Sequence, residues 1–181
     1  MKRSTCQSVL AGLALSSLAL ASAARATVID AQANGFMVEQ DLTIAAPAAK
    51  VWDALAHVGA WWDPAHSYSH EPRNLSIDLK PGGQWLETLP GGGVLHMTVV
   101  LVKPRETLRL EGALGPLQAF GVAGHLTWIL KEKDGATQLT ETYDVGGHAP
   151  GGLDKAAALV DGVLAQQVGR LKRYVETGKA E

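Results

Sequence analysis

The sequence predicts an α+β domain in which a seven-stranded antiparallel sheet packs against one long C-terminal helix. Short segments of alternating apolar and polar residues recur between residues 36 and 145, and this period of two is typical of half-buried strands. Tight-turn sequences separate these segments, which favours antiparallel neighbours. Residues 153–176 instead carry apolar side chains at spacings of three and four, the pattern of an amphipathic helix. A sheet covered by helices on one face is the α+β arrangement.

The amino terminus has the features of a cleaved secretory signal peptide. Lys2 and Arg3 precede an apolar stretch at residues 9–24, and residues 24–26 read Ala-Arg-Ala, a small-x-small cleavage pattern. The stretch is shorter than the roughly 20 apolar residues that span a bilayer. We therefore expect cleavage after Ala26, with Ala23 as the alternative, and a periplasmic or secreted protein that keeps no stable membrane anchor.

The only cysteine, Cys6, precedes the apolar stretch, so the remaining residues, 27–181, have none. No disulfide or cysteine metal ligand is therefore expected in the mature protein. Its net charge is about −5, since the leader removes three basic residues and no acidic one. No basic run or stripe is present, so we expect neither nucleic acid nor an anionic membrane surface as a partner.

The first strand and short helices are predicted directly after the leader. Residues 36–44 alternate, with Phe36, Val38 and Leu42 among the apolar members. Pro47 then suits the first turn of a helix, and Val51 and Leu55 follow at helical spacing.

Six further strands are predicted at residues 75–79, 85–89, 94–102, 107–110, 124–131 and 137–145. The turn sequences between them are KPGG, PGGG and KPRE, and an Asp134-Gly135 pair lies between the last two. Asp-Gly is a strong signal for a tight hairpin. The long helix at residues 153–176 has an apolar stripe formed by Leu153, Ala157, Val160, Leu164, Val168, Leu171 and Val175.

The segment VEQDLTIAAPAAKVWDALAHVGAWW resembles the opening of the START-like (SRPBCC) superfamily, which has the helix-grip fold. The motifs PGGQW and VKPRETLRL, with the terminal helix, are similar to its bacterial branch of homologues of the activator of Hsp90 ATPase. The resemblance covers nearly all of residues 27–181 and implies one domain. It also implies two short helices after the first strand, and a curved sheet that wraps the long helix around an apolar cavity. Members bind lipids, hormones or polyketides, or act as cyclases, hydrolases and co-chaperones. We do not expect Hsp90 as a partner, because an exported protein does not meet the cytosolic chaperone.

The stretch HVGAWWDPAHSYSHE, residues 57–71, combines two tryptophans with three histidines. We expect Trp61 or Trp62 at the mouth of the cavity; the alternative is that both rings cap the core. His66, His70 and Glu71 could supply metal ligands, but the prolines and serines between them indicate a loop. Four-residue spacing suits a metal on a helix, so we expect no metal here.

A second group of polar residues lies in QWLETLPGGGVLHMTV. A four-residue turn at 90–93 would place Glu87 directly opposite His96, on the same face as Trp85. Composition alone predicts that the opposite, apolar face of this hairpin is the buried one. The resemblance instead implies that the aromatic residue after the paired glycines faces the cavity. If this face is inward, Glu87 could orient His96 as a general base, or both could hold the polar end of a ligand.

The last predicted hairpin gives further candidates. Glu141 and Tyr143 share a face with Leu139, and Trp128 lies on the neighbouring strand. They would line the cavity if that face is the inner one, and the alternative is a strand whose polar residues face water.

No Ser-His-Asp arrangement, phosphate-binding loop or dinucleotide fingerprint is present. We therefore expect an exported binding protein for a small hydrophobic ligand (lipid, aromatic or polyketide-like), with no cofactor and no metal. One alternative is an enzyme of the cyclase, dehydratase or hydrolase kind that uses His96 and Glu87, and another is a protein-interaction module. The expected ligand-binding residues are Trp61, Trp62, Trp85, Glu87, His96, Trp128, Glu141 and Tyr143.

Overall fold

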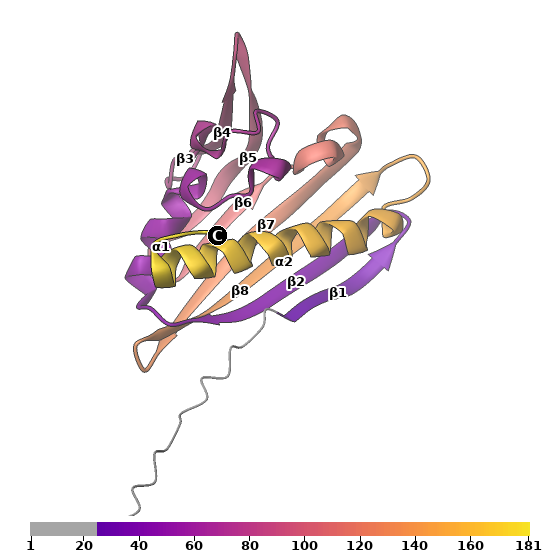
Figure 1. Cartoon of the computed structure of the whole chain (residues 1–181). Helices are drawn as coiled ribbons and strands as arrows, with labels where there is room; N and C mark the ends of the chain where they lie inside the picture. The colour runs from indigo at the N-terminus through magenta and orange to yellow at the C-terminus, as the bar shows by residue number, and fades with distance from the viewer. Residues whose placement is uncertain (1–24) are drawn as a thin grey trace, which may run out of the picture.

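A computed structural model describes residues 25–181, which form one antiparallel sheet with a long helix lying across it (Figure 1). The strands follow the order β1-β2-β8-β7-β6-β5-β4-β3 in the sheet. Their bounds are β1 Arg25–Gln32, β2 Gly35–Ile44, β3 Leu75–Ile77, β4 Gln84–Leu89, β5 Gly92–Lys103, β6 Thr107–Glu111, β7 Gly121–Lys133 and β8 Ala136–His148. The predicted signal peptide lies outside the described residues, apart from its last two residues, which begin β1.

The sheet has eight strands, so the prediction of seven was wrong by one edge strand. The added strand, β1, pairs with β2 through a two-residue turn, with Gln32 opposite Gly35. Ala33 and Asn34 form the turn, and Gly35 begins β2. The strand was missed because Val28 and Ile29 are exposed, so β1 lacks the alternation that marks a half-buried strand.

The long helix α2 spans Asp154–Thr177 and confirms the amphipathic pattern. It packs mainly against β2 and β1, with Leu164, Val168 and Leu171 buried against the sheet. Gly178 ends it in a left-handed conformation at φ 79°, which a residue with a Cβ adopts at a cost. No helix among residues 25–181 is both long and apolar enough to cross a bilayer.

Only one of the two short helices expected after the first strand is an α-helix, α1 at Ala48–Ala56. Single 3₁₀ turns follow it at η1 Val58–Ala60, η2 Pro64–His66 and η3 Pro72–Asn74, and η4 Gly115–Ala119 lies between β6 and β7. Prolines at the starts of η2 and η3 favour such short turns, because proline fixes φ and lacks an amide donor. This irregular segment packs against β3 and β4, at the edge of the sheet opposite to β1 and β2.

The β4–β5 hairpin differs from its predicted register. Its turn has two residues, Pro90 and Gly91, so Glu87 lies opposite Val94 and not opposite His96. A β-bulge after Trp85 then leaves His96 as an extra residue on β5. His96 nevertheless shares the face of Glu87, because Val94 lies opposite Glu87 and His96 follows Val94 by two residues on β5. The face with Trp85, Glu87 and His96 is therefore the inner one.

The β7–β8 hairpin confirms the Asp-Gly signal. Asp134 and Gly135 both have positive φ, 53° and 76°, as a type I′ turn requires. The register that follows places Leu139, Glu141 and Tyr143 on the buried face of β8. These are the side chains predicted to share one face, and that face is the inner one.

Candidate functional site

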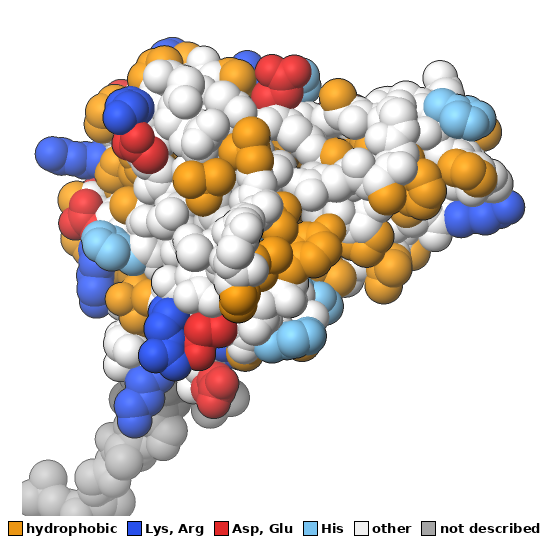
Figure 2. Space-filling view, turned by 90° about the horizontal axis from the view of Figure 1, so that it is seen from above, with side chains coloured by type: hydrophobic (Ala, Val, Ile, Leu, Met, Phe, Trp, Pro, Cys, Tyr) orange, Lys and Arg blue, Asp and Glu red, His pale blue; other side chains and the backbone are white. Residues whose placement is uncertain are grey.

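A cavity of about 440 Å³ opens between the sheet and the N-terminal half of α2. Its other walls are the segment around η2 and the η4 turn. The face seen from above in Figure 2 has hydrophobic side chains near its centre and charged side chains mostly toward its edges. The volume lies within the roughly 300–1,000 Å³ of typical small-molecule sites.

The walls of this cavity are mostly apolar. One side is built by α2 with Ala156, Leu159, Val160, Val163 and Leu164. Leu159 is 73% exposed, which is unusual for a large aliphatic side chain and places it at the rim. The η4 turn forms the opposite side with Leu114, Gly115, Pro116, Leu117 and Phe120. An isolated aliphatic surface residue needs no explanation, but apolar residues that surround a cavity mark a ligand site.

The tryptophan pair lies on the third side, and its two rings have different roles. Trp62 lines the cavity, and its Nε1 donates to the carbonyl of His66 at 2.9 Å. Trp61 is directed into the core, where its Nε1 donates to the carbonyl of Ala54 at 2.8 Å. Both rings are buried, so neither is an exposed anchor for a protein partner. The sequence predicts Trp61 or Trp62 at the mouth of the cavity, and of the two only Trp62 lines the cavity.

Aromatic rings continue from Trp62 across the inner surface of the cavity. The ring centroids of Trp62 and Trp85 are 4.9 Å apart, and the two planes are nearly perpendicular at 88°. His96 lies 5.7 Å from Trp85 and 6.0 Å from Tyr68, by the same measure. All four residues line the cavity. Edge-to-face and tilted rings at these distances pack favourably and give a flat ligand aromatic surfaces to contact.

His96 and Glu87 form a buried pair beside these rings. His96 Nε2 lies 3.0 Å from Glu87 Oε2, and both residues are at most 7% exposed. Glu87 also accepts backbone hydrogen bonds from Ser69 (2.5 Å) and Tyr68 (3.2 Å). Glu87 itself does not line the cavity, whereas His96 does. The carboxylate therefore holds both the histidine ring and the loop that carries Tyr68.

Burial and hydrogen bonding set the charge of this pair. Burial alone would raise the pKa of Glu87, but hydrogen bonds from Ser69, Tyr68 and His96 outweigh it and lower that pKa. Burial lowers the pKa of His96, and the hydrogen bond and negative charge of Glu87 oppose this shift only in part. At neutral pH the pair is a carboxylate facing a neutral imidazole. A neutral ring can bond to a carboxylate only through its N–H, so Nε2 carries the proton.

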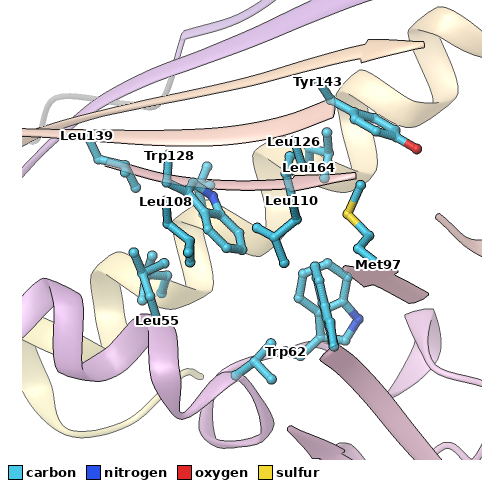
Figure 3. Packing of buried hydrophobic residues seen from close by; sticks show 14 of the residues in the cluster. Leu55, Trp62, Met97, Leu108, Leu110, Leu126, Trp128, Leu139, Tyr143 and Leu164 are labelled. Atoms are coloured by element: carbon cyan, nitrogen blue, oxygen red, sulfur yellow. The ribbon is translucent and has the colours of Figure 1, made fainter. Parts of the chain in front are cut away.

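The other predicted ligand-binding residues lie deeper in the molecule. Trp128, Glu141 and Tyr143 do not line the cavity, because they belong to the core between sheet and helix. Figure 3 shows Trp128 among leucines, at a distance from Trp62, and Tyr143 at another side of the cluster. Trp128 Nε1 donates to Glu141 Oε1 at 2.7 Å. The Tyr143 hydroxyl accepts from the amide of Leu114 at 3.0 Å, so it supports the η4 wall from behind.

Two histidines of the tryptophan segment, His66 and His70, have different surroundings. His66 lines the cavity, and its Nε2 is 3.3 Å from Gln166 Oε1 on α2. His70 is exposed, with φ at 53°. Within residues 25–181, no three His, Cys, Asp or Glu side chains converge as metal ligands.

Sequence reasoning missed Tyr68, Leu159 and Val163 as cavity residues. Leu159 and Val163 offered a signal, because they form a second apolar line, four residues apart, beside the main stripe of α2. Tyr68 offered no signal beyond its place near Trp62.

Comparisons with known proteins agree with this architecture. Residues 36–176 match the family model described as polyketide cyclase / dehydrase and lipid transport. The chain belongs to this family, of the SRPBCC type with the helix-grip fold. No curated protein matches it.

Solved structures of the same fold are distant in sequence. A conserved protein of unknown function from Enterococcus faecalis, EF2215, is 17% identical with a TM-score of 0.60, over 87% of this chain and 80% of the other. The Aha1 dimer from Colwellia psychrerythraea is 19% identical with a TM-score of 0.57, over 79% and 98%. DynU16, a protein in the dynemicin biosynthetic locus, is 26% identical with a TM-score of 0.55. That match covers 80% of this chain, which spans about half (48%) of the DynU16 chain.

Proposed function

We propose that this protein binds a small hydrophobic molecule, a lipid, aromatic or polyketide-like compound, in the cavity between the sheet and α2. The observation that carries this proposal is the 440 Å³ cavity, whose walls are apolar except for a few polar groups. Apolar pockets with few polar groups are the usual form of a small-molecule site. The family, which includes lipid transport, supports the same assignment.

We also propose that the protein is exported and acts as a carrier or sensor outside the cytoplasm. The apolar leader with its Ala-Arg-Ala pattern supports this, and the cut after Ala26 would leave all but two residues of β1. Sequencing the amino terminus of the protein from a periplasmic or culture fraction should give Thr27 as the first residue. An intact leader on the folded protein would contradict export by cleavage.

Mass spectrometry of the bound molecules tests the binding proposal. The mature chain should be incubated with a bacterial lipid extract, repurified and extracted with organic solvent. We expect an apolar compound enriched over the same extract passed through an equal amount of an unrelated protein. A chain that returns no compound above this control would contradict the proposal.

A second candidate function is catalysis of the cyclase or dehydratase kind. The hydrogen bond from His96 to Glu87 favours it, because a carboxylate that orients a histidine is a common arrangement for a general base. Once a bound compound is known, its conversion to a product during incubation would assign catalysis. Recovery of the unchanged compound would assign binding alone.

A further inference from the structure

The few polar side chains of the cavity differ in how much hydrogen-bonding capacity they leave for a ligand. The Ser67 hydroxyl donates to the carbonyl of Pro64 at 3.0 Å, and the Tyr68 hydroxyl donates to the carbonyl of Gly115 at 3.0 Å. His66 is exposed at the rim, where water competes for its ring. His96 is 7% exposed and Ser67 is 8% exposed, but the Ser67 hydroxyl already has its partner. Among the described cavity residues, the indole Nε1 of Trp85 is a second buried group without a partner, and it can only donate a hydrogen bond.

The hydrogen bonds of His96 leave one ring nitrogen for a ligand. Its Nε2 is bound to Glu87 Oε2, whereas its Nδ1 has no hydrogen-bond partner among residues 25–181. Since Nε2 carries the proton, Nδ1 presents a lone pair and accepts hydrogen bonds. A buried acceptor that finds no donor in the protein or its ligand costs free energy when water is expelled.

The charge of the surroundings determines which donors can approach this lone pair. None of the described residues that line the cavity is a lysine, arginine, aspartate or glutamate. The nearest charge is the Glu87 carboxylate behind the ring, 3.0 Å from Nε2. A ligand carboxylate would meet a lone pair and a second negative charge, with no cation to offset its loss of water. A neutral hydroxyl brings the missing proton without a charge.

We propose that His96 is a specificity-determining residue that selects neutral, flat apolar molecules with one hydroxyl group, bound to Nδ1, and rejects carboxylates. The inference rests on the proposed binding function and names the ligand class of that site. The rings of Trp62, Trp85 and Tyr68 would surround the apolar part of such a molecule. Glu87 is a positioning residue, because it fixes the proton on the other side of the ring.

Displacement of the neutral probe Nile red by matched naphthalene derivatives tests this inference. 2-Naphthol has the hydroxyl donor, 2-methoxynaphthalene has an oxygen that only accepts, and 2-naphthoate is an anion at neutral pH. We expect 2-naphthol to compete about fivefold more strongly than 2-methoxynaphthalene, the change that one net hydrogen bond produces. 2-Naphthoate should be the weakest competitor.

Three variants, His96→Leu, His125→Leu and His66→Leu, show which residue causes the preference. In His96→Leu the preference for 2-naphthol should fall to about one. In His125→Leu, which changes an exposed histidine of β7, the preference should be unchanged. A preference that survives in His96→Leu, or that disappears in His66→Leu instead, would overturn the proposal. Tighter binding of 2-naphthoate than of 2-naphthol would overturn it too.

Nitrogen NMR of the wild-type chain gives the same answer if His96→Leu does not fold. The Nδ1 resonance of His96 should have the position of an unprotonated nitrogen, and it should shift with 2-naphthol but not with 2-methoxynaphthalene. A protonated Nδ1 would contradict the inference. Nile red binding without a 2-naphthol preference would overturn this inference alone, whereas failure of every compound and of Nile red to bind would overturn the proposed function as well.

Discussion

The carboxyl group of Glu141 is buried on the inner face of β8, where its Oε1 accepts from Trp128 Nε1 at 2.7 Å. Its Oε2 has no partner among residues 25–181, and neither has Oε1 of Gln40, the residue directly opposite on β2. Burial raises the pKa of Glu141 to about 8, and the hydrogen bond from Trp128 offsets this only in part. Glu141 is therefore a neutral acid at pH 7.

This raised pKa makes the stability of the fold depend on pH. In the unfolded chain Glu141 ionises near its ordinary pKa of 4.5, whereas in the folded chain it keeps its proton up to about pH 8. The folded state thus binds more protons over this interval, so the free energy of unfolding falls as pH rises from about 4.5 to about 8. The stabilising contribution is complete below pH 4.5 and is lost above pH 8.

The substitution Glu141→Gln should remove this dependence, because glutamine is neutral at every pH and its oxygen can still accept from Trp128. We expect the stability of the variant, relative to wild type, to rise by a few kcal/mol between pH 5 and pH 8. Urea unfolding at both pH values measures it. Glu106→Gln removes an exposed carboxylate and serves as the control. Its stability relative to wild type should be nearly the same at pH 5 and at pH 8. Equal pH dependence in Glu141→Gln and wild type would contradict the buried neutral acid.

At the scale of elements, the residues that follow η2 contact η4 at the cavity. The Tyr68 hydroxyl joins them by its hydrogen bond to the carbonyl of Gly115, 3.0 Å away. Tyr68 is 50% exposed, so this bond contributes little to the stability of the core. It instead joins two walls of the cavity.

The substitution Tyr68→Phe should therefore speed ligand exchange more than it weakens the fold. We expect the dissociation rate of Nile red, measured by stopped-flow fluorescence, to increase a few-fold, since one hydrogen bond across the walls is lost. The melting temperature should change little. Tyr174→Phe, on α2 away from the cavity, serves as the matched control. An unchanged dissociation rate in Tyr68→Phe would show that the two walls do not gate exchange.

Over the whole molecule, the elements with strong local signals were predictable. The α2 helix and the β7–β8 hairpin follow from periodicity and from Asp134-Gly135, because these signals depend on neighbouring residues alone. The exposed edge strand β1 was not predictable by the same rule. Its neighbouring residues Val28 and Ile29 are both exposed, so its sequence lacks the alternation of a half-buried strand.

The residues of the candidate site were predictable only in part. Trp62, Trp85 and His96 were expected near the cavity, and they line it. The two-residue turn and the β-bulge of the β4–β5 hairpin were not foreseen, because Gly92 and Gly93 suit a turn and a strand equally well. The η4 wall depends on contacts with segments far away in the chain, such as the Tyr143 hydroxyl bound to the amide of Leu114.

The central claim is that the space between the sheet and α2 is a binding site for an apolar molecule. It can be tested on α2 with two tryptophan substitutions of equal size. Ala156 lines the cavity, whereas Ala158 is exposed on the same helix and does not. Ala156→Trp should fill part of the cavity, and Ala158→Trp should leave it open.

Titration with Nile red, followed by fluorescence, compares these two variants with wild type. We predict saturable binding of one probe molecule per chain to wild type and to Ala158→Trp, and binding at least tenfold weaker to Ala156→Trp with its melting temperature preserved. Binding that is absent from wild type, or equally strong in both variants, would contradict the claim that this cavity holds the ligand.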